Sequence, residues 1–345
     1  MVKKYPNAEI HFLIYREFQT ASHFLTEAHK FHYFERTEWS NWINQAEVPL
    51  LKPVKELGRL INTLNEEEFD MVWNWTHQKS SAYLMELIQS EEKVGLQTKF
   101  GKFSLGGSDA LKNFNDQFVE LNNEGPHYLV HLAKIFNLEI PSPEISRSSL
   151  RKDKENLICI QPLTSDAKKN WDLRFFKEWI DRHQSLRPQD QICIFGAPAE
   201  KPKLEEAFPA RMIKILKLYE VEKVLQHADL LLTVDTAIKH LAVLTGTQIL
   251  ELSLGSAQPK KTGAWMDQYH VIAPKIDCWP CSHSKSCSQA SHACAEELTS
   301  KDLGEIVIGL IEGKQHQKLK KYSNAILSSG GTHVEGNRKL LSFST

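Results

Sequence analysis

The chain has 345 residues, of which 41% are hydrophobic and 25% charged, the proportions of an ordinary folded protein of about two domains. Its 42 Lys and Arg nearly balance 43 Asp and Glu, so no global positive field attracts nucleic acid, and no nucleic-acid partner is expected. The first residues lack the apolar core of a secretion signal, and charges interrupt the most apolar stretch, residues 230–254, too often for it to span a bilayer. We therefore expect a cytoplasmic protein.

The first half of the chain predicts strands at residues 9–15, 69–75 and 93–97, where short apolar and β-branched runs occur. The second half alternates more regularly. It predicts strands at 156–162, 191–196, 212–216, 230–235, 248–254 and 270–273, and helices at 173–183, 221–226, 237–244 and 300–312. This alternation predicts an α/β fold in which helices cover parallel sheets.

Residues 140–156, IPSPEISRSSLRKDKEN, have the Pro, Ser and charge content that is typical of a linker. They predict one domain at 1–145 and another at 155–313, with residues 314–345 as a fraying helix and a loose tail. Two α/β domains joined in this way are expected to enclose a cleft. Open α/β sheets bind ligands at the carboxyl ends of their strands, so the loops that follow strands are the first places to search.

One such transition is LLLTVDTAIKHLAVLTGT, in which a strand ends at Asp235 and Thr236 and a helix begins at once. The unpaired amides of a helix N-terminus can hold a phosphate. Thr236 and His240 are four residues apart and share a helical face, so both can point at the same anion. In the alternative interpretation, Asp235 or Thr236 merely caps the helix and His240 packs against the sheet.

A second transition, ICIQPLTSDAKKNW, places the hydroxyls of Thr164 and Ser165 just after a strand and Lys168 and Lys169 shortly beyond. Such groups suit a diphosphate, because charge-assisted hydrogen bonds contribute about 1.5–3 kcal/mol each. The alternative is a solvated lysine pair before an amphipathic helix. A third transition, FGAPAE, brings the carboxylate of Glu200 to the same sheet edge, where it can accept from ribose hydroxyls.

Five blocks occur in order across residues 156–300: ICIQPLTSDAKKNW, FGAPAE, VLQHADLLLTVDTAIKHLA, LSLGSAQPKKTG and CWPCSHSKSC. Together they resemble the donor-binding half of the ADP-heptose:lipopolysaccharide heptosyltransferases, glycosyltransferase family 9. The first half is similar more loosely, through KKYPNAEIHFLIY, FDMVWNWTHQKSSA, KVGLQ and GPHYLVHLAKIFNL. The resemblance implies a GT-B fold of two Rossmann-like domains, with the acceptor side in the N-terminal domain and the nucleotide-sugar donor in the C-terminal domain.

The resemblance also implies the reaction. A heptose or related sugar would pass from an ADP-linked donor to a lipopolysaccharide core or other lipid-linked acceptor, with inversion at the anomeric carbon and without a metal or cofactor. The acceptor would lie at the inner face of the cytoplasmic membrane, so peripheral contact with the inner membrane is expected. The basic run GKQHQKLKKYS could rest on such an anionic surface, or form a solvated helix end.

Residue roles follow by the same resemblance. Thr164, Ser165 and Lys169 would hold the diphosphate, and Lys169 would neutralise the leaving nucleotide. Glu200 would bind the ribose, and Leu216, on the loop after its strand, would pack on the adenine.

The remaining roles fall on the strand-to-helix transition LLLTVDTAIKHLAVLTGT. Asp235 would contact the sugar or its diphosphate, while the amides of Thr236 and Ala237 and the ring of His240 would complete the phosphate site. Lys169 and Asp235 are thus the predicted catalytic residues.

Three positions depart from the family's pattern. Its Asp-Ser/Thr-Gly is Asp235-Thr236-Ala237 here, and Ala257 and Gln258 replace the Thr and Asp that follow a Gly-Pro turn. In the first domain Asn74-Trp75-Thr76, followed by His77, stands where Asp-Leu-Gln is usual, which leaves the acceptor open.

The family opens with a strand and a glycine-containing loop whose Asp is the general base. This chain begins with MVKKYPNAEI, which resembles the end of the first helix. We expect the true start to lie upstream of Met1, with a catalytically impaired nucleotide-sugar-binding homologue as the alternative. An in-frame upstream stretch that encodes the strand and loop would support this expectation, and an immediate stop codon would contradict it. A sheet without that strand would have a gap or an uncovered edge.

Four cysteines have the spacing C-x2-C-x5-C-x6-C: Cys278, Cys281, Cys287 and Cys294. They could form a structural zinc site, with His283 and His292 as spare ligands, or a reduced or partly disulfide-bonded loop. The resemblance favours the loop, because a similar cluster in the family needs no metal for activity. The zinc alternative implies a third functional hypothesis, a zinc-stabilised interaction module. Scattered histidines such as His23, His29 and His32 are assigned no role.

Overall fold

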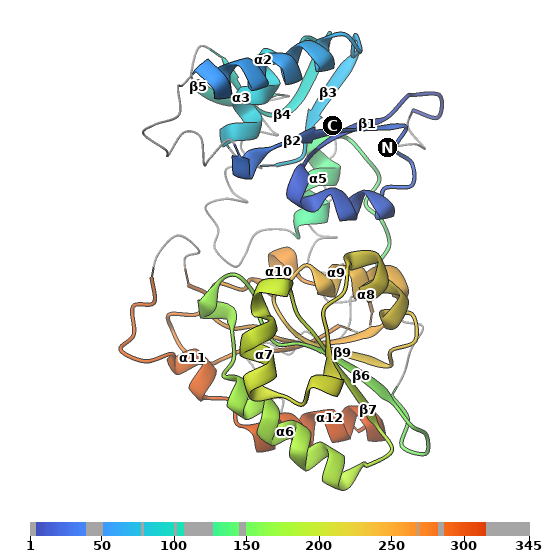
Figure 1. Cartoon of the computed structure of the whole chain (residues 1–345), viewed down its shortest axis with the longest axis vertical. Helices are drawn as coiled ribbons and strands as arrows, with labels where there is room; N and C mark the ends of the chain where they lie inside the picture. Colours follow the sequence, from blue (N-terminus) through green and yellow to red (C-terminus); the bar gives the residue numbers. More distant parts are fainter. Residues whose placement is uncertain are drawn as a thin grey trace, which may run out of the picture. The chain divides into compact units, whose positions relative to one another are not determined.

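The computed structural model describes residues 5–38, 51–76, 79–99, 102–106, 127–144, 150–267, 269–281 and 286–314. The chain divides into two compact units (Figure 1). The N-terminal unit comprises Met1–Leu121 and Tyr128–Pro141, and the C-terminal unit comprises Asn122–His127 and Ser142–Thr345. The predicted tail from residue 315 on, His77 and His283 lie outside the described residues.

The C-terminal unit is built on a sheet of six parallel strands in the order β11-β10-β9-β6-β7-β8. Parallel strands that are covered on both faces are continuously apolar, and every residue of LLLTV in β9 is buried. The strands are β6 (Leu157–Gln161), β7 (Gln191–Phe195), β8 (Ile213–Lys214), β9 (Leu230–Val234), β10 (Gln248–Leu252) and β11 (Tyr269–Ile272).

Helices α6, α7 and α12 share one apolar core with these strands, and α6 lies beside α12 in Figure 1. Helix α6 buries Phe176, Trp179 and Ile180 at helical spacing, and Asp172 caps it by accepting a hydrogen bond from the Arg174 amide at 2.8 Å. The helices of the unit are α6 (Leu173–Leu186), α7 (Lys201–Ala207), α8 (Leu218–Leu225), α9 (Ile238–Thr245), α10 (Pro259–Thr262), α11 (Ala293–Glu296) and α12 (Ser300–Glu312).

The strand order places a topological switch point between β6 and β9. From β6 the chain moves to β7 and β8 on one side, and it then returns to β9 on the other side of β6. The loops that leave the carboxyl ends of β6 and β9 therefore turn in opposite directions, and ligands of open α/β sheets bind in the crevice between such loops.

The described strands of the N-terminal unit form two separate sheets. β1 pairs with β2 in parallel, while β3 and β4 are parallel and β5 is antiparallel to β4. The elements of the unit are β1 (His11–Tyr15), the 3-10 helix η1 (Arg16–Phe24), β2 (Lys30–Phe34), α2 (Leu51–Asn65), β3 (Met71–Asn74), α3 (Lys79–Leu87), β4 (Glu92–Lys99), β5 (Lys102–Gly106) and α5 (Tyr128–Ile135).

An aromatic cluster joins β3 to the end of α5. The ring of Phe136 lies 4.8 Å from that of Trp73 and 4.4 Å from that of Trp75, measured between centroids. The Tyr128 hydroxyl donates to the Trp75 carbonyl at 2.6 Å. Gly95 in β4 has φ +105°, and a Cβ there would lie 2.3 Å from the Asn74 carbonyl oxygen, so only glycine allows this close approach of β3 and β4.

The α/β prediction is confirmed, and all nine predicted strands are present with ends shifted by at most two residues. β2 and β5 were not predicted. In β2 the sequence KFHYF carries His32, which was assigned no role, yet His32 is only 6% exposed. Pairing with the apolar β1, which a local pattern does not reveal, makes this segment a strand.

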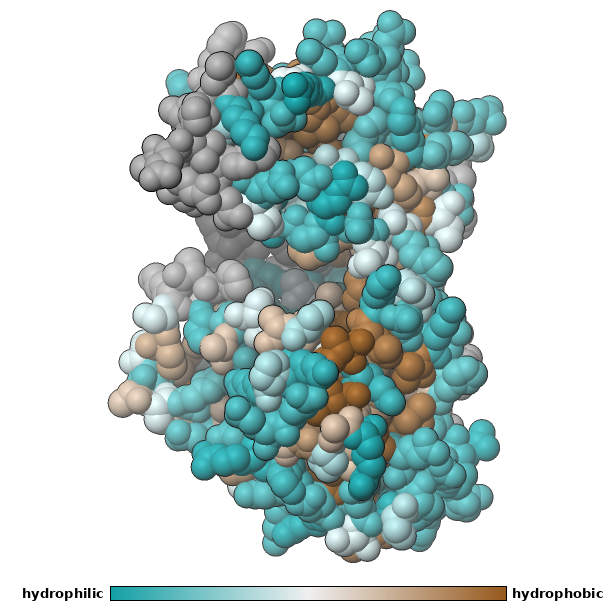
Figure 2. All heavy atoms as spheres, viewed as in Figure 1, coloured by the Kyte–Doolittle hydropathy of each residue, from teal (hydrophilic) through white to brown (hydrophobic). Residues whose placement is uncertain are grey.

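Within the described residues, no helix is both long enough and apolar enough to cross a membrane. Figure 2 shows that the face it presents is mostly hydrophilic, with apolar residues gathered on one area of the C-terminal unit.

Candidate functional site

Two side chains from different loops meet at the switch point. The Lys169 ammonium, at the end of the 3-10 helix η2 (Ala167–Lys169) after β6, lies 2.8 Å from Asp235 Oδ2, directly after β9. The side chains are 16% and 12% exposed, so the pair is largely removed from water yet still accessible. The prediction of a solvated lysine pair is therefore wrong for Lys169, because Asp235 holds its ammonium at the sheet edge.

A buried chain of charges continues from Asp235 into the protein. The ammonium of Lys239, in the first turn of α9, contacts Asp235 Oδ1 and also lies 2.8 Å from Glu251 Oε2 in β10. The hydroxyl of Tyr269, in β11, donates to the same Glu251 oxygen at 2.8 Å. Lys239 and Glu251 side chains are 1% and 0% exposed, and Glu251 Oε1 has no hydrogen-bond partner within the described part of the chain.

These charges fix the ionisation states of Asp235 and Lys239. Burial opposes the charge on Asp235, but the ammonium groups of Lys239 and Lys169 outweigh it and lower its pKa to about 2. Burial likewise opposes the charge on Lys239, yet Glu251 and Asp235 together raise its pKa. Asp235 is therefore a fixed carboxylate at neutral pH, suited to accept hydrogen bonds and poorly suited to take a proton.

Helix α9 begins directly beyond Asp235 without a side-chain cap. Ala237 occupies the N-cap position, and among the described residues neither Asp235 nor Thr236 accepts a hydrogen bond from a backbone amide of the first turn, so the alternative of a merely capped helix is wrong. Thr236 Oγ1 lies 3.4 Å from Thr233 Oγ1. The first-turn amides thus have no side-chain acceptor, which is the arrangement that favours an anion.

His240 lies two residues into α9 and is exposed, so it does not pack against the sheet as the alternative required. The crowded protein around its ring makes charging unfavourable, and the Lys239 charge adds to this effect, so its pKa falls to about 4. The imidazole is therefore neutral at pH 7 and offers one N–H donor without a charge.

The loop after β6 is closed by its own side chains. Asn170 Oδ1 accepts from the Thr164 amide at 2.8 Å, and Asn170 Nδ2 donates to the Thr164 carbonyl at 3.2 Å. Asp166 accepts from the Lys168 amide at 3.1 Å and from the Ser256 hydroxyl at 2.6 Å. Thr164 is half-buried and Ser165 is exposed, so both hydroxyls lie on a loop whose backbone is already fixed.

Segments distant in sequence support this loop from behind. Gly255 has φ +56°, and a Cβ there would lie 2.1 Å from the Lys168 carbonyl oxygen. His292 Nε2 donates to the same oxygen at 2.8 Å, and Trp171 Nε1 donates to the Ala295 carbonyl at 3.1 Å. Sequence reasoning missed these supports because each joins positions about 90 to 120 residues apart. The available signal that LSLGSAQP contacts this loop was its departure from the family pattern.

The other predicted donor residues follow the neighbouring strands. Glu200 lies beyond β7, where its Oε2 accepts from the Ala197 amide at 2.8 Å and so closes the 3-10 turn η3 (Pro198–Glu200). Leu216 follows β8 and is half-buried. No hydrogen bond or ion pair among the described residues joins either of them to Lys169 or Asp235.

The cysteine segment follows β11 and carries four free thiols, of which Cys294 is buried and Cys287 exposed. No disulfide joins them, so of the two forms proposed for this loop the structure has the reduced one. Burial raises the pKa of Cys281, and the nearby Cys278 and Cys294 add to the effect. Within the described part of the chain these thiols do not gather as a metal-ligand set, and His292, expected as a spare ligand, donates instead to the Lys168 carbonyl.

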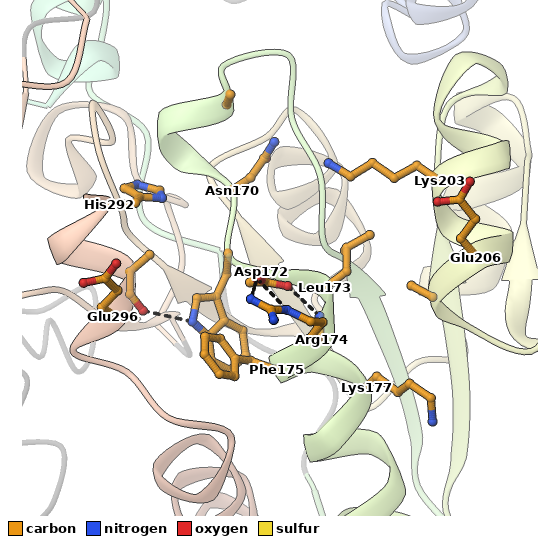
Figure 3. Close-up of a pocket in the computed structure, with 14 residues that line it drawn as sticks. Asn170, Asp172, Leu173, Arg174, Phe175, Lys177, Lys203, Glu206, His292 and Glu296 are labelled. Carbon is orange, nitrogen blue, oxygen red and sulfur yellow. Dashed lines mark hydrogen bonds and ion pairs between the residues drawn. The ribbon is translucent and has the colours of Figure 1, made fainter. Parts of the chain in front are cut away.

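A hollow beside the loop after β6 is lined by none of the residues predicted to bind the nucleotide-sugar donor (Figure 3). Arg174, which lines it, is paired with Asp172 at 2.7 Å (Figure 3), and the Trp171 indole donates to the Ala295 carbonyl. The candidate site therefore remains the switch point. The hollow is lined by Ala167, Asn170, Trp171, Asp172, Leu173, Arg174, Phe175, Lys177, Lys203, Glu206, Ala207, His292, Ala295 and Glu296.

In the N-terminal unit, the residues that depart from the family's pattern have structural partners. Asn74 Nδ2 donates to the Leu96 carbonyl at 2.6 Å, and its Oδ1 accepts from the Thr76 amide at 3.1 Å. Trp75 stacks on Phe136. These side chains order the end of β3.

A family model described as glycosyltransferase family 9 (heptosyltransferase) matches residues 57–292. Comparison with curated proteins gives no significant match. Among solved structures, Escherichia coli heptosyltransferase WaaC with ADP is 16% identical, with a TM-score of 0.58 over 90% of this chain and 92% of that one.

Two further structures are similar to the chain. The family 9 glycosyl transferase from Veillonella parvula is 15% identical, with a TM-score of 0.62 over 91% of each chain. Escherichia coli ADP-heptose lps heptosyltransferase II is 12% identical, with a TM-score of 0.55 over 90% of this chain and 92% of that one. At such identities the likeness shows the fold, and it confirms the predicted α/β class of GT-B type.

Proposed function

The chain belongs to glycosyltransferase family 9 and is a sugar-transferring enzyme, and from this premise we propose that its donor is an ADP-linked heptose or related sugar. The Lys169–Asp235 pair at the switch point between β6 and β9 is the observation that carries the proposal. The similar E. coli protein is an ADP-heptose lps heptosyltransferase, which supports the choice of donor and of a lipopolysaccharide core acceptor.

The donor diphosphate would lie between the loop after β6 and the first turn of α9. The Lys169 ammonium has three N–H donors, and Asp235 uses one, so two remain for phosphate oxygens. The hydroxyls of Thr164 and Ser165, the amides of Thr236 and Ala237 and the neutral ring of His240 would add further donors. As the glycosidic bond breaks, negative charge grows on the departing diphosphate, and these donors stabilise it without a metal ion.

Asp235 would accept hydrogen bonds from the sugar. With its pKa held at about 2, it stays ionised, and its charge favours the positive character that develops at the anomeric carbon. For the same reason we assign deprotonation of the acceptor hydroxyl to a different group. Attack by that hydroxyl opposite the leaving diphosphate inverts the anomeric centre.

The nucleoside would extend along the edge of the sheet toward β7 and β8. One Glu200 oxygen accepts from the Ala197 amide, and the other would accept from a ribose hydroxyl. Leu216, half-buried after β8, would pack on the adenine. We also propose that the enzyme acts in the cytoplasm on a lipid-linked core acceptor and makes peripheral contact with the inner membrane.

Calorimetric titration of the full chain with ADP, with UDP and GDP as controls, tests the donor site. We expect selective ADP binding that Lys169→Ala weakens by about 30- to 150-fold, the loss of one or two charge-assisted hydrogen bonds. Lys177→Ala, at an exposed lysine on α6, is the matched control and should bind as the wild type does. Transfer from ADP-heptose is followed by mass spectrometry. ADP binding without turnover would favour the impaired homologue, and folded protein that binds no nucleotide would refute the donor assignment.

A further inference from the structure

A second cluster of chemically capable side chains lies in the N-terminal unit. His11 opens β1, His32 lies in β2, and Glu67 follows the end of α2. One ligand atom from each of the three lies within 4.8 Å of the others, and they are the only such group of His, Cys, Asp and Glu in the described part of the chain. The proposed transfer reaction uses none of them.

The parallel pairing of β1 with β2 brings the two imidazoles together. His11 is in register with Lys30, and His32 is two residues further along, so both rings lie on one face of the pair. His11 Nδ1 is 3.1 Å from His32 Nε2 and 3.9 Å from Glu67 Oε2. Tetrahedral zinc with bonds of about 2.0–2.2 Å sets its ligand atoms roughly 3.3–3.5 Å apart, between the two distances found.

The surroundings of His11 resemble those of a metal ligand. Its Nε2 lies 3.0 Å from Glu9 Oε1, and if that nitrogen carries the proton, Nδ1 presents its lone pair to His32 and Glu67. A carboxylate on the outer nitrogen of a ligating histidine is the usual second layer of a metal site. The His11 side chain is 7% exposed, and Phe69 stands edge-on to its ring at 5.3 Å.

We infer that His11, His32 and Glu67 bind a divalent transition-metal ion, Zn²⁺ in the first instance, with a water molecule as the fourth ligand. Two imidazoles and one carboxylate form a donor set that suits this ion. The ion would tie β1 and β2 to the segment between α2 and β3. Lys30 weakens the binding of this ion, because its ammonium contacts the other Glu67 oxygen, Oε1, and brings a like charge close to the cation.

The test uses the full chain, stripped with a chelator and titrated with Zn²⁺ alone. X-ray absorption at the zinc edge of the wild-type protein identifies the ligands, because nitrogen and oxygen neighbours differ from sulfur neighbours. We expect a population of zinc with imidazole scattering and no sulfur. A first shell of sulfur alone would assign the zinc to Cys278–Cys294 and overturn the inference, as would stripped protein that binds no zinc.

Variants sharpen the test by calorimetry. His32→Gln and Glu67→Gln should each weaken the imidazole-bound zinc at least tenfold, and Glu9→Gln should weaken it about 10- to 100-fold. His23→Gln and Glu66→Gln, neighbouring residues outside the cluster, should bind as the wild type does. Lys30→Gln should bind zinc several-fold more tightly, a gain that a purely structural ion pair would not give. Unchanged affinity in folded His32→Gln and Glu67→Gln would refute the site; where they do not fold, the absorption spectrum of the wild type decides.

Discussion

Replacing Lys239 with methionine is expected to destabilise the C-terminal unit by about 3–5 kcal/mol, the cost of removing one partner from a buried ion pair. The ammonium joins Asp235 to Glu251, and neither Lys239 nor Glu251 reaches solvent. Without it, Glu251 keeps only the Tyr269 hydroxyl, and its Oε1 already has no partner among the described residues. Methionine fills the space of the lysine stem, so the loss measures charge rather than a cavity.

The double variant Lys239→Met, Glu251→Leu removes both members of the Lys239–Glu251 pair and should recover at least half of the loss, because apolar side chains of similar size often replace a buried pair without cost. Lys177→Met is the control. Its exposed pair with Asp181 has the same spacing of four residues as the buried pair of Lys239 with Asp235, and its loss should cost less than about 1 kcal/mol.

Urea unfolding, followed by circular dichroism and tryptophan fluorescence, measures these free energies. A loss below about 1 kcal/mol for Lys239→Met, or a double variant as unstable as the single one, would refute the view that the two charges stabilise each other. ADP binding provides a second readout: we expect the folded double variant to retain it, since Lys169 still holds Asp235.

Three other changes test the loop and its charges. Gly255→Ala should weaken ADP binding more than tenfold and should also lower the free energy of unfolding, because its Cβ would displace the Lys168 carbonyl and its positive φ disfavours a side chain; equal affinity in a titration of the folded variant would contradict the support described for the loop. Asn170→Ala, which removes both bonds to Thr164, should cost about 1–3 kcal/mol in urea unfolding, and an unchanged midpoint would show that the loop closes without them. The folded pKa of Asp235 lies below its ordinary value, so its contribution to stability is complete above about pH 4 and is lost as pH falls through about 2. The unfolding free energies of the wild type and of Asp235→Asn should therefore converge over this range. Parallel curves would refute the lowered pKa of Asp235.

The candidate site could be predicted in part because strand ends are local features. The buried run before Asp235 and the strand before Thr164 fixed both loops, and parallel strands bring such ends to one edge. Lys169 and Asp235 are 66 residues apart, and their contact needed the order of the strands, which places β9 beside β6. Local patterns carry no such information.

The buried pair had a signal that was not used. Glu251 interrupts an apolar strand, and Lys239 lies four residues after Asp235 on one helical face, so each charge needed a partner inside the protein. The charges of Lys239 and Glu251 served only to argue against a membrane span. The missed strand β2 has the same cause, because His32 was assigned no role although its ring contacts His11 in the neighbouring strand.

The pair of Lys239 and Glu251 also constrains how this sequence can change over generations. Replacement of Lys239 alone leaves Glu251 as an unmatched charge in the interior, whereas replacement of Glu251 alone leaves Lys239 paired with Asp235. Descendants that keep the fold and have lost Lys239 should therefore have lost Glu251 as well. The pair can then serve as a lineage marker, by which sequences that inherited this interior are distinguished from those that never had it.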